Sequence, residues 1–242
     1  MNLGAEIDGF VPPPHPANMM LEGVFASLHP LSVASHADQL FDAFQKDESG
    51  MNWSYLSYGP FTSLQSFKTW LASVENLDDP VFFTVMDNAN KKAVGLTSFL
   101  RITPEHGSIE VGHIHFSPLM QNTILGTEAM YMMMRWAFQA GYRRYEWKCN
   151  ALNSKSRNAA QRLGLSYEGV FRQHYIHKGR NRDTAWFAAI DTEWPALKRC
   201  FERYLDPDNM GEDNRPKSSL TSLTRPLLFK TDTSEFFDKP DI

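Results

Sequence analysis

The sequence is poor in several features that would place it in a specialised class of protein. It has only two cysteines in 242 residues, Cys149 and Cys200, which are too few for a disulfide framework. It has no apolar run long enough to cross a bilayer, and no basic-then-apolar leader at its start. Its 24 basic and 28 acidic side chains give a net charge of −4, without the basic character of a nucleic-acid-binding protein. These absences predict a cytoplasmic protein that binds neither nucleic acid nor membranes.

What the chain does contain is an alternation of strand and helix patterns. Apolar residues make up 42% of it, which is enough for a substantial core in one large α/β domain over residues 19–205. Alternating apolar residues between turns predict strands at 21–31, 80–86, 94–102, 108–116, 142–149, 167–176 and 183–190. Three- and four-residue spacing predicts helices at about 35–46, 62–73, 125–140, 153–163 and 192–203. We expect Ser35 or His36, Thr62 or Ser63, and Thr192 to cap three of them.

Two extensions flank this domain. Residues 1–18 are rich in proline and glycine and predict an extended arm without its own core. Residues 206–242 are mostly polar, with a few apolar side chains that include Phe236 and Phe237. This tail is either disordered or an arm that docks on its own domain or on a partner subunit.

A polar loop leads straight into the long helix at 125–140. The first N–H groups of a helix have no partner within it, and the helix dipole makes this end positive. Such an end is suited to a phosphate group. Residues 121–127 therefore predict an anion site, although an ordinary entry into a helix has the same composition.

Two segments resemble one enzyme family. Residues 121–129 (QNTILGTEA) resemble the acyl-CoA pyrophosphate loop of the GNAT superfamily of N-acetyltransferases. Gln121 and Gly126 match its outer positions, whereas Ile124 replaces the usual first glycine. Residues 153–169 (NSKSRNAAQRLGLSYEG) resemble the N-x-x-S…A-x-R-L-G-F-x-x-E-G segment of the RimJ/RimL-like branch, which acetylates ribosomal-protein N-termini and related amines. The resemblance covers about residues 21–203.

The resemblance implies a fold and a reaction. The fold is a single GNAT-like α/β domain, in which helices flank a mixed, mainly antiparallel sheet that is splayed in its middle. The reaction transfers an acetyl group from acetyl-CoA, without a metal, directly to a primary amine on a small molecule, an aminoacyl compound or a protein N-terminus. A homodimer is compatible with it. The residues implied in cofactor binding are Gln121, Asn122, Thr123, Ile124, Leu125, Gly126, Thr127, Asn153 and Arg157. Because Ile124 adds a Cβ where the diphosphate approaches, a non-catalytic acyl-CoA-binding module is the alternative, and a scaffold without CoA affinity is the third class.

Three residues are candidates for proton transfer. The resemblance implies Glu110 as the base for the amine and Ser156 as the proton donor to the leaving thiolate. Their structural alternatives are a strand carboxylate paired with a cation and a simple helix cap. His113 is a second candidate base because histidine titrates near neutral pH. Glu110 and His113 point to opposite faces of a regular strand, unless the bulge that is usual in this family intervenes. Glu168 is a weaker candidate.

The acceptor side is predicted from aromatic and basic residues. Trp53, Tyr55 and Tyr58 form either a wall of the acceptor pocket or a packed loop over the core. Arg172 and His174, on a later strand, are expected to face the acceptor. The turn at 178–183 (KGRNRD) is either a solvated hairpin tip or a site for an anionic acceptor.

Overall fold

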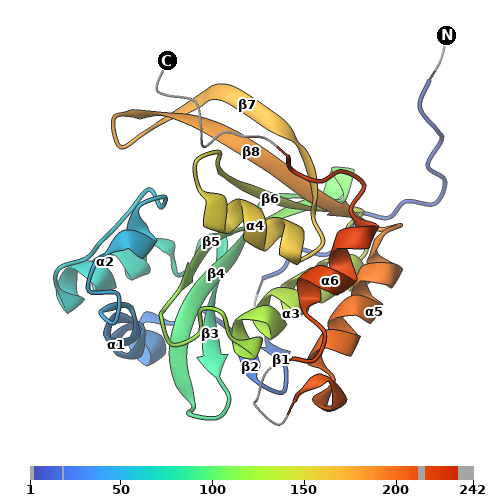
Figure 1. Ribbon diagram of the computed structural model, residues 1–242. Helices are drawn as coiled ribbons and strands as arrows, with labels where there is room; N and C mark the ends of the chain where they lie inside the picture. The colour runs from blue at the N-terminus through green and yellow to red at the C-terminus, as the bar shows by residue number, and fades with distance from the viewer. Residues whose placement is uncertain (1–2, 18, 212–215, 234–242) are drawn as a thin grey trace.

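Eight strands form one sheet in the order β1-β2-β3-β4-β5-β6-β8-β7 (Figure 1). The computed structural model describes residues 3–17, 19–211 and 216–233. Neighbouring strands are antiparallel except β5 and β6, which are parallel. The strands are β1 (Leu21–Glu22), β2 (Ala26–Pro30), β3 (Val81–Asp87), β4 (Lys92–Thr103), β5 (Ser108–Phe116), β6 (Arg144–Asn150), β7 (Ser166–His177) and β8 (Arg180–Ile190). The predicted mixed, mainly antiparallel sheet is confirmed.

Helices cover both faces of the sheet (Figure 1). They are α1 (Val33–Phe44), α2 (Leu64–Val74), α3 (Ile124–Ala140), α4 (Ser154–Arg162), α5 (Trp194–Leu205) and α6 (Leu220–Thr224). Consecutive residues of a strand point to opposite faces. Accordingly Phe82 packs in the core cluster of α1 and α2, whereas Phe83 packs in the larger cluster with α3 and α5. The sheet therefore separates two cores.

Short polar side chains begin most of the helices. Ser32, Ser63 and Asn153 accept a hydrogen bond from the backbone three residues on, as N-caps do. The α1 cap is Ser32 rather than the predicted Ser35 or His36. Helix α5 follows Glu193 without a side-chain cap, so the prediction for Thr192 is wrong.

The predicted first strand is broken at a corner. It divides into β1 and β2 because Glu128 of α3 accepts hydrogen bonds from the backbone N–H groups of Val24, Phe25 and Ala26, at 2.9, 2.6 and 2.8 Å. This buried carboxylate satisfies three donors that a continuous strand would direct to a neighbour. Periodicity cannot reveal such a contact, because Glu128 lies about a hundred residues further along the chain.

Strands β5 and β6 diverge in the middle of the sheet. Their pairing ends at Val111 and Trp147, although β5 continues to Phe116 and β6 to Asn150. On its other side β5 contains a bulge, where His113 adopts a φ of 50° and the register with β4 shifts. Bulges bend a strand and re-aim its side chains. The predicted splay is therefore present, and it leaves one edge of β5 open beyond Val111.

The described parts of both extensions pack on the domain. The carbonyl oxygen of Pro14 accepts a hydrogen bond from the Tyr142 hydroxyl at 3.1 Å. Residues 216–233, which we call the C-terminal strap, pass α5 and α4 and reach the start of β7. Leu220 and Thr224 of the strap are fully buried. These residues dock on the chain's own domain, which is one of the possibilities predicted for the tail. Phe236 and Phe237 lie outside the described residues.

Candidate active site

A cavity of about 250 Å³ lies where β5 and β6 diverge. Consecutive residues of both strands line it, so it reaches both faces of the sheet at the gap. The lining also includes the start of α4 and the loop after α1. It comprises Asn52, Tyr55, Leu56, Ser57, Leu100, Arg101, Glu110, Val111, Gly112, His113, Ile114, Trp147, Lys148, Cys149, Asn150, Asn153, Ser156 and Arg182. The structure thus brings together all three predicted proton-transfer residues.

Glu110 lies at the centre of a chain of alternating charges. Its Oε2 accepts a hydrogen bond from Arg101 Nε at 2.6 Å and forms an ion pair with Lys148 Nζ at 2.9 Å. Lys148 also pairs with Glu146 at 2.8 Å, and Arg144 joins Glu146 to Glu168. The side chains of Glu110 and Lys148 are each only 4% exposed, so water screens this pair little. Glu110 is therefore both a cavity residue and part of a structural network, and no described residue donates a hydrogen bond to its Oε1.

His113 lies at the bulge and faces the cavity from the side of α2. Its Nδ1 shares a hydrogen bond with the Tyr58 hydroxyl at 3.1 Å, and the two rings stack with centroids 5.7 Å apart. Burial, with the nearby charge of Arg101 as a second cause, lowers the pKa of His113 to about 4. The imidazole is consequently neutral at pH 7 and a weak proton acceptor. The bulge allows His113 and Glu110 to line one cavity.

Ser156 lies across the gap, at the start of α4. Its backbone N–H donates to the capping oxygen of Asn153 at 3.1 Å, which fixes the first turn. Its Oγ accepts a hydrogen bond from Trp147 Nε1 at 2.9 Å. Trp147 occupies one of the two acceptor positions of this hydroxyl, which also has one proton to donate. Cys149 lies in the same wall, where burial raises the pKa of its thiol to about 11. This thiol is therefore a buried group that is protonated at neutral pH.

The predicted phosphate loop enters α3 through a side-chain cap. Thr123 Oγ1 accepts from Gly126 N at 3.3 Å and donates to Met120 O at 2.7 Å. Gln121 donates to Phe116 O at 2.7 Å, and Asn122 adopts a φ of 59°. Several side chains of this loop therefore shape it rather than project from it, which leaves the N–H groups of the first helical turn as the donors for an anion.

The tight packing of the loop explains its glycine. A Cβ on Gly126 would lie 2.9 Å from the carbonyl oxygen of Met120. Thr127, which was predicted to bind the cofactor, is buried. Its hydroxyl accepts from Arg162 Nη2 at 2.9 Å and donates to Thr123 O at 3.3 Å. Its side chain therefore joins α3 to α4 rather than reaching a ligand.

Arg157 was predicted to act near the phosphates, and its position corrects that expectation. It is buried, and its Nε and Nη2 donate to the two carboxylate oxygens of Asp232 in the C-terminal strap, each at 2.6 Å. Its Nη1 donates to Ala151 O at 2.7 Å. The guanidinium thus faces the strap, because a buried cation requires a buried counter-charge.

Comparison with known proteins identifies the family. The acetyltransferase (GNAT) domain family matches residues 27–166, more than half of the chain. The chain belongs to the GNAT acetyltransferase family. The GCN5-related N-acetyltransferase from Brucella melitensis is 39% identical, with a TM-score of 0.88, and the match covers 90% of this chain and 99% of that one. A GNAT-family protein from Chromobacterium violaceum is 36% identical, with a TM-score of 0.76, over 81% and 98% of the two chains.

A more distant structure shares the fold. It is RimL, a ribosomal-protein α-N-acetyltransferase in complex with coenzyme A, at 18% identity and a TM-score of 0.61 over 72% of this chain and 99% of that one. No curated protein matches the chain. The family match and the structures from Brucella melitensis and Chromobacterium violaceum support an acyl-CoA-dependent acetyltransferase. Within the described ranges, no helix is long and apolar enough to span a membrane.

In this GNAT acetyltransferase the aromatic loop divides between cavity and core. Tyr55 lines the cavity, and its hydroxyl donates to Leu152 O at 3.3 Å, which joins the loop to the turn before α4. Trp53 is only 5% exposed and stacks on His115 with ring centroids 3.7 Å apart. This position corrects the prediction that Trp53 lines the pocket. The half-buried Tyr58 stacks on Trp70 and reaches the cavity only through His113.

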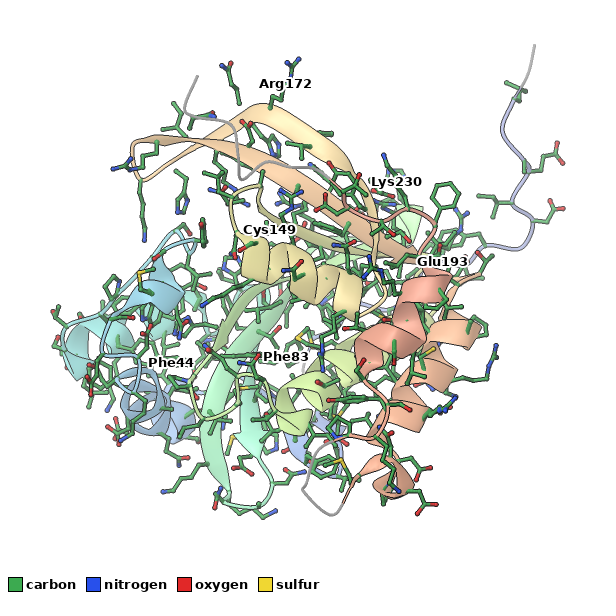
Figure 2. All side chains as sticks on the ribbon, viewed as in Figure 1. Phe44, Phe83, Cys149, Arg172, Glu193 and Lys230 are labelled. Carbon is green, nitrogen blue, oxygen red and sulfur yellow. The ribbon has the colours of Figure 1, made fainter. Side chains whose placement is uncertain are left out.

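The predicted acceptor residues on β7 differ in position. Arg172 is exposed and points away from the domain at the outer edge of β7 (Figure 2), so the expectation that it faces the acceptor is wrong. His174 packs its ring against Tyr175 and lies 6.0 Å from the ring of Trp186. It is near the cavity but does not line it.

The cavity residues that were not predicted include Arg101, Lys148 and Trp147. The signal for Lys148 was available, because charges at 144, 146 and 148 alternate along a predicted strand and so share one face. Trp147 could not be singled out, since its indole N–H gains its role only through Ser156. Arg101 could be predicted as a cavity residue only if the register between β4 and β5 were known.

Proposed function

We propose that this enzyme transfers the acetyl group of acetyl-CoA to a primary amine by direct attack of the amine on the thioester. The observation that carries the proposal is the pairing of Ser156 and Glu110 across one cavity. Ser156 Oγ accepts one hydrogen bond from Trp147 and has a hydroxyl proton to donate, and no described residue donates a hydrogen bond to Glu110 Oε1. Amine acylation needs both roles.

The residues around the gap fit acetyl-CoA. Beyond Val111 the edge of β5 that faces β6 has no strand partner, and such an edge pairs readily with an extended amide-containing chain. The pantetheine arm is such a chain. The start of α3 at Ile124 supplies helix-terminal N–H groups for the diphosphate. Asn153 lies at the cavity beside Ser156, where it holds the first turn of α4 in place.

The proton balance follows from these roles. An ammonium acceptor loses one proton before attack, because only the neutral amine has a lone pair. We assign this proton to Glu110 Oε1, directly or through water, from which it passes to solvent. The C–N bond forms and the C–S bond breaks. The thiolate then takes the Ser156 hydroxyl proton, and Ser156 regains one from the nitrogen of the new amide. His113, neutral at pH 7, orients the acceptor beside Glu110.

Activity and binding assays test this proposal. Thiol release from acetyl-CoA is measured with a panel of amines, and the acetylated product is identified by mass spectrometry. Ser156→Ala and Glu110→Gln should each lower kcat by roughly 10²–10⁴-fold while acetyl-CoA still raises the thermal midpoint. Near-normal kcat in Glu110→Gln would move the role of base to His113, Glu168 or water.

One observation supports a rival function. Ile124 places a side chain where related loops have glycine, and it is half-buried against the core at the helix start. A diphosphate held less closely there would suit a module that binds acyl-CoA without transfer. Binding of acetyl-CoA with no thiol release and no acetylated product from any amine would favour this module over the enzyme.

A further inference from the structure

The inner face of β8 presents polar groups that find no partner in the protein. Arg182 Nε, Thr184 Oγ1 and Trp186 Nε1 are all buried without a hydrogen-bond partner among the described residues. They lie at alternate positions of one strand, so they share a face and follow each other at intervals of roughly 6.5–7 Å. Buried polar groups are nearly always satisfied in folded proteins, and an exception calls for an unseen partner.

The chemistry of these groups defines that partner. A guanidinium and an indole N–H are donors only, and they cannot accept a hydrogen bond. A hydroxyl can donate as well. The missing partner must therefore be rich in acceptor atoms.

Arg182 also has an uncompensated charge. The six charges that run from Arg101 through Glu110, Lys148, Glu146 and Arg144 to Glu168 alternate in sign and balance one another. Arg182 stands outside this chain. Its guanidinium lies 5.6 Å from the ring of Tyr175, and no carboxylate among the described residues pairs with it. Burial lowers the pKa of Arg182 although Cys149, Tyr175 and Glu110 act in the opposite direction.

The position of Arg182 joins it to the reaction site. Arg182 lines the same cavity as Glu110, Lys148 and Ser156. Lys148, which is paired with Trp186 across β6 and β8, lies over its indole ring at 3.8 Å. Lys148 of β6 and Arg182 of β8 thus make this wall of the cavity cationic.

We infer that the acceptor amine carries an anionic oxygen group, a carboxylate or a phosphate, which Arg182 binds at this wall while the amine lies at Glu110. The inference rests on the proposed transfer to an amine and names its substrate class. An anion at Arg182 supplies both a counter-charge for the guanidinium and an acceptor for its Nε–H. Arg182 is then a specificity-determining residue, and it takes no part in the proton transfers.

A matched series of acceptors tests this assignment. One series consists of ω-amino acids with two to five methylene groups, and a second of aminoalkyl phosphates of the same lengths. The control series is the carboxamides of the same amino acids, which keep size and amine but lose the charge. A charge-assisted hydrogen bond contributes about 1.5–3 kcal/mol, which corresponds to about 10–100-fold in kcat/KM. The wild-type enzyme should prefer one anionic series to the amides by this factor, and the preferred series separates carboxylate from phosphate.

Two variants then locate the preference. Arg182→Gln should remove it, by lowering kcat/KM for the anionic acceptors and leaving the amides unchanged, and Arg182→Lys should keep part of it. Arg180→Gln is the matched control, because Arg180 is an exposed arginine of the same strand and the substitution changes charge equally. Each variant must retain the thermal shift by acetyl-CoA that shows an intact cofactor site.

The outcomes are distinguishable. Equal use of anionic and neutral acceptors by the wild-type enzyme rejects the inference and leaves amine transfer standing. An equal loss for both series in Arg182→Gln also rejects it, because Arg182 would then only support the wall. If acetyl-CoA binds but no member of any series is acetylated, the inference falls together with the proposed function. If Arg182→Gln fails to fold, the wild-type comparison alone decides.

Discussion

Removing the Asp232 carboxylate should destabilise the whole domain. Asp232→Ala removes a carboxylate that is only 4% exposed and that pairs with the buried guanidinium of Arg157. Breaking a buried ion pair by deleting one partner costs about 3–5 kcal/mol. Folded domains have only about 5–15 kcal/mol of stability in total. For a chain of this size the loss corresponds to a fall in Tm of about 6–20 °C.

Urea unfolding monitored by tryptophan fluorescence measures this loss, and two variants control it. Glu202→Ala removes an exposed pair with Lys198 one helical turn away, which should cost only about 0.3–0.5 kcal/mol. Arg157→Met combined with Asp232→Leu replaces the pair by apolar groups and should recover most of the stability. A cost in Asp232→Ala no larger than in Glu202→Ala would refute the argument that the strap supplies the counter-charge of Arg157.

Three further perturbations test the core and the cofactor loop. Trp53→Ala should cost roughly 3–5 kcal/mol in urea unfolding while leaving the acceptor KM unchanged, because Trp53 packs on His115 in the core. Burial lowers the pKa of His115 to about 3. Between pH ~6.5 and pH 3 only the unfolded chain takes up this proton, so the free energy of unfolding falls as the pH falls. In His115→Phe the free energy of unfolding, measured at a series of pH values, should fall less steeply. Gly126→Ala should weaken acetyl-CoA binding in calorimetry, since its Cβ would lie 2.9 Å from Met120 O and must displace the loop; unchanged affinity would mean that the loop does not position the cofactor.

Local patterns were sufficient to predict most of the fold. The helix that begins beside Gly126 was placed within one residue of its start, because its apolar stripe and its entry loop are adjacent in sequence. The N-caps were found within a few residues for the same reason. The prediction failed where a long-range contact determines the local structure. The corner that divides β1 from β2 depends on Glu128, which no periodic pattern connects to Gly23.

In the candidate site, too, contacts within one segment were predictable and contacts between distant segments were not. Ser156 and Asn153 belong to one helix start, and their arrangement follows from a contiguous motif. The surroundings of Glu110 come from β4 and β6, so its ion pairs with Arg101 and Lys148 had no signature in its own segment. Arg157 shows the same limit more sharply, since its partner lies 75 residues away in the strap. A sequence motif thus names residue types correctly and can still assign the wrong contact.

The two sides of the cavity therefore differ in how far a short run of sequence predicts them. The cofactor side is built from backbone donors and helix caps, which depend on a short run of sequence and which related acetyltransferases can share. The acceptor side is built from charges on four strands, and its net sign emerges only when the strands are aligned. Because the balanced chain of ion pairs uses the carboxylates of Glu110, Glu146 and Glu168, the surplus charge of Arg182 is a property of the assembled sheet. The register of β6 and β8 is consequently a better predictor of the substrate class of such an enzyme than the motif that identifies the family.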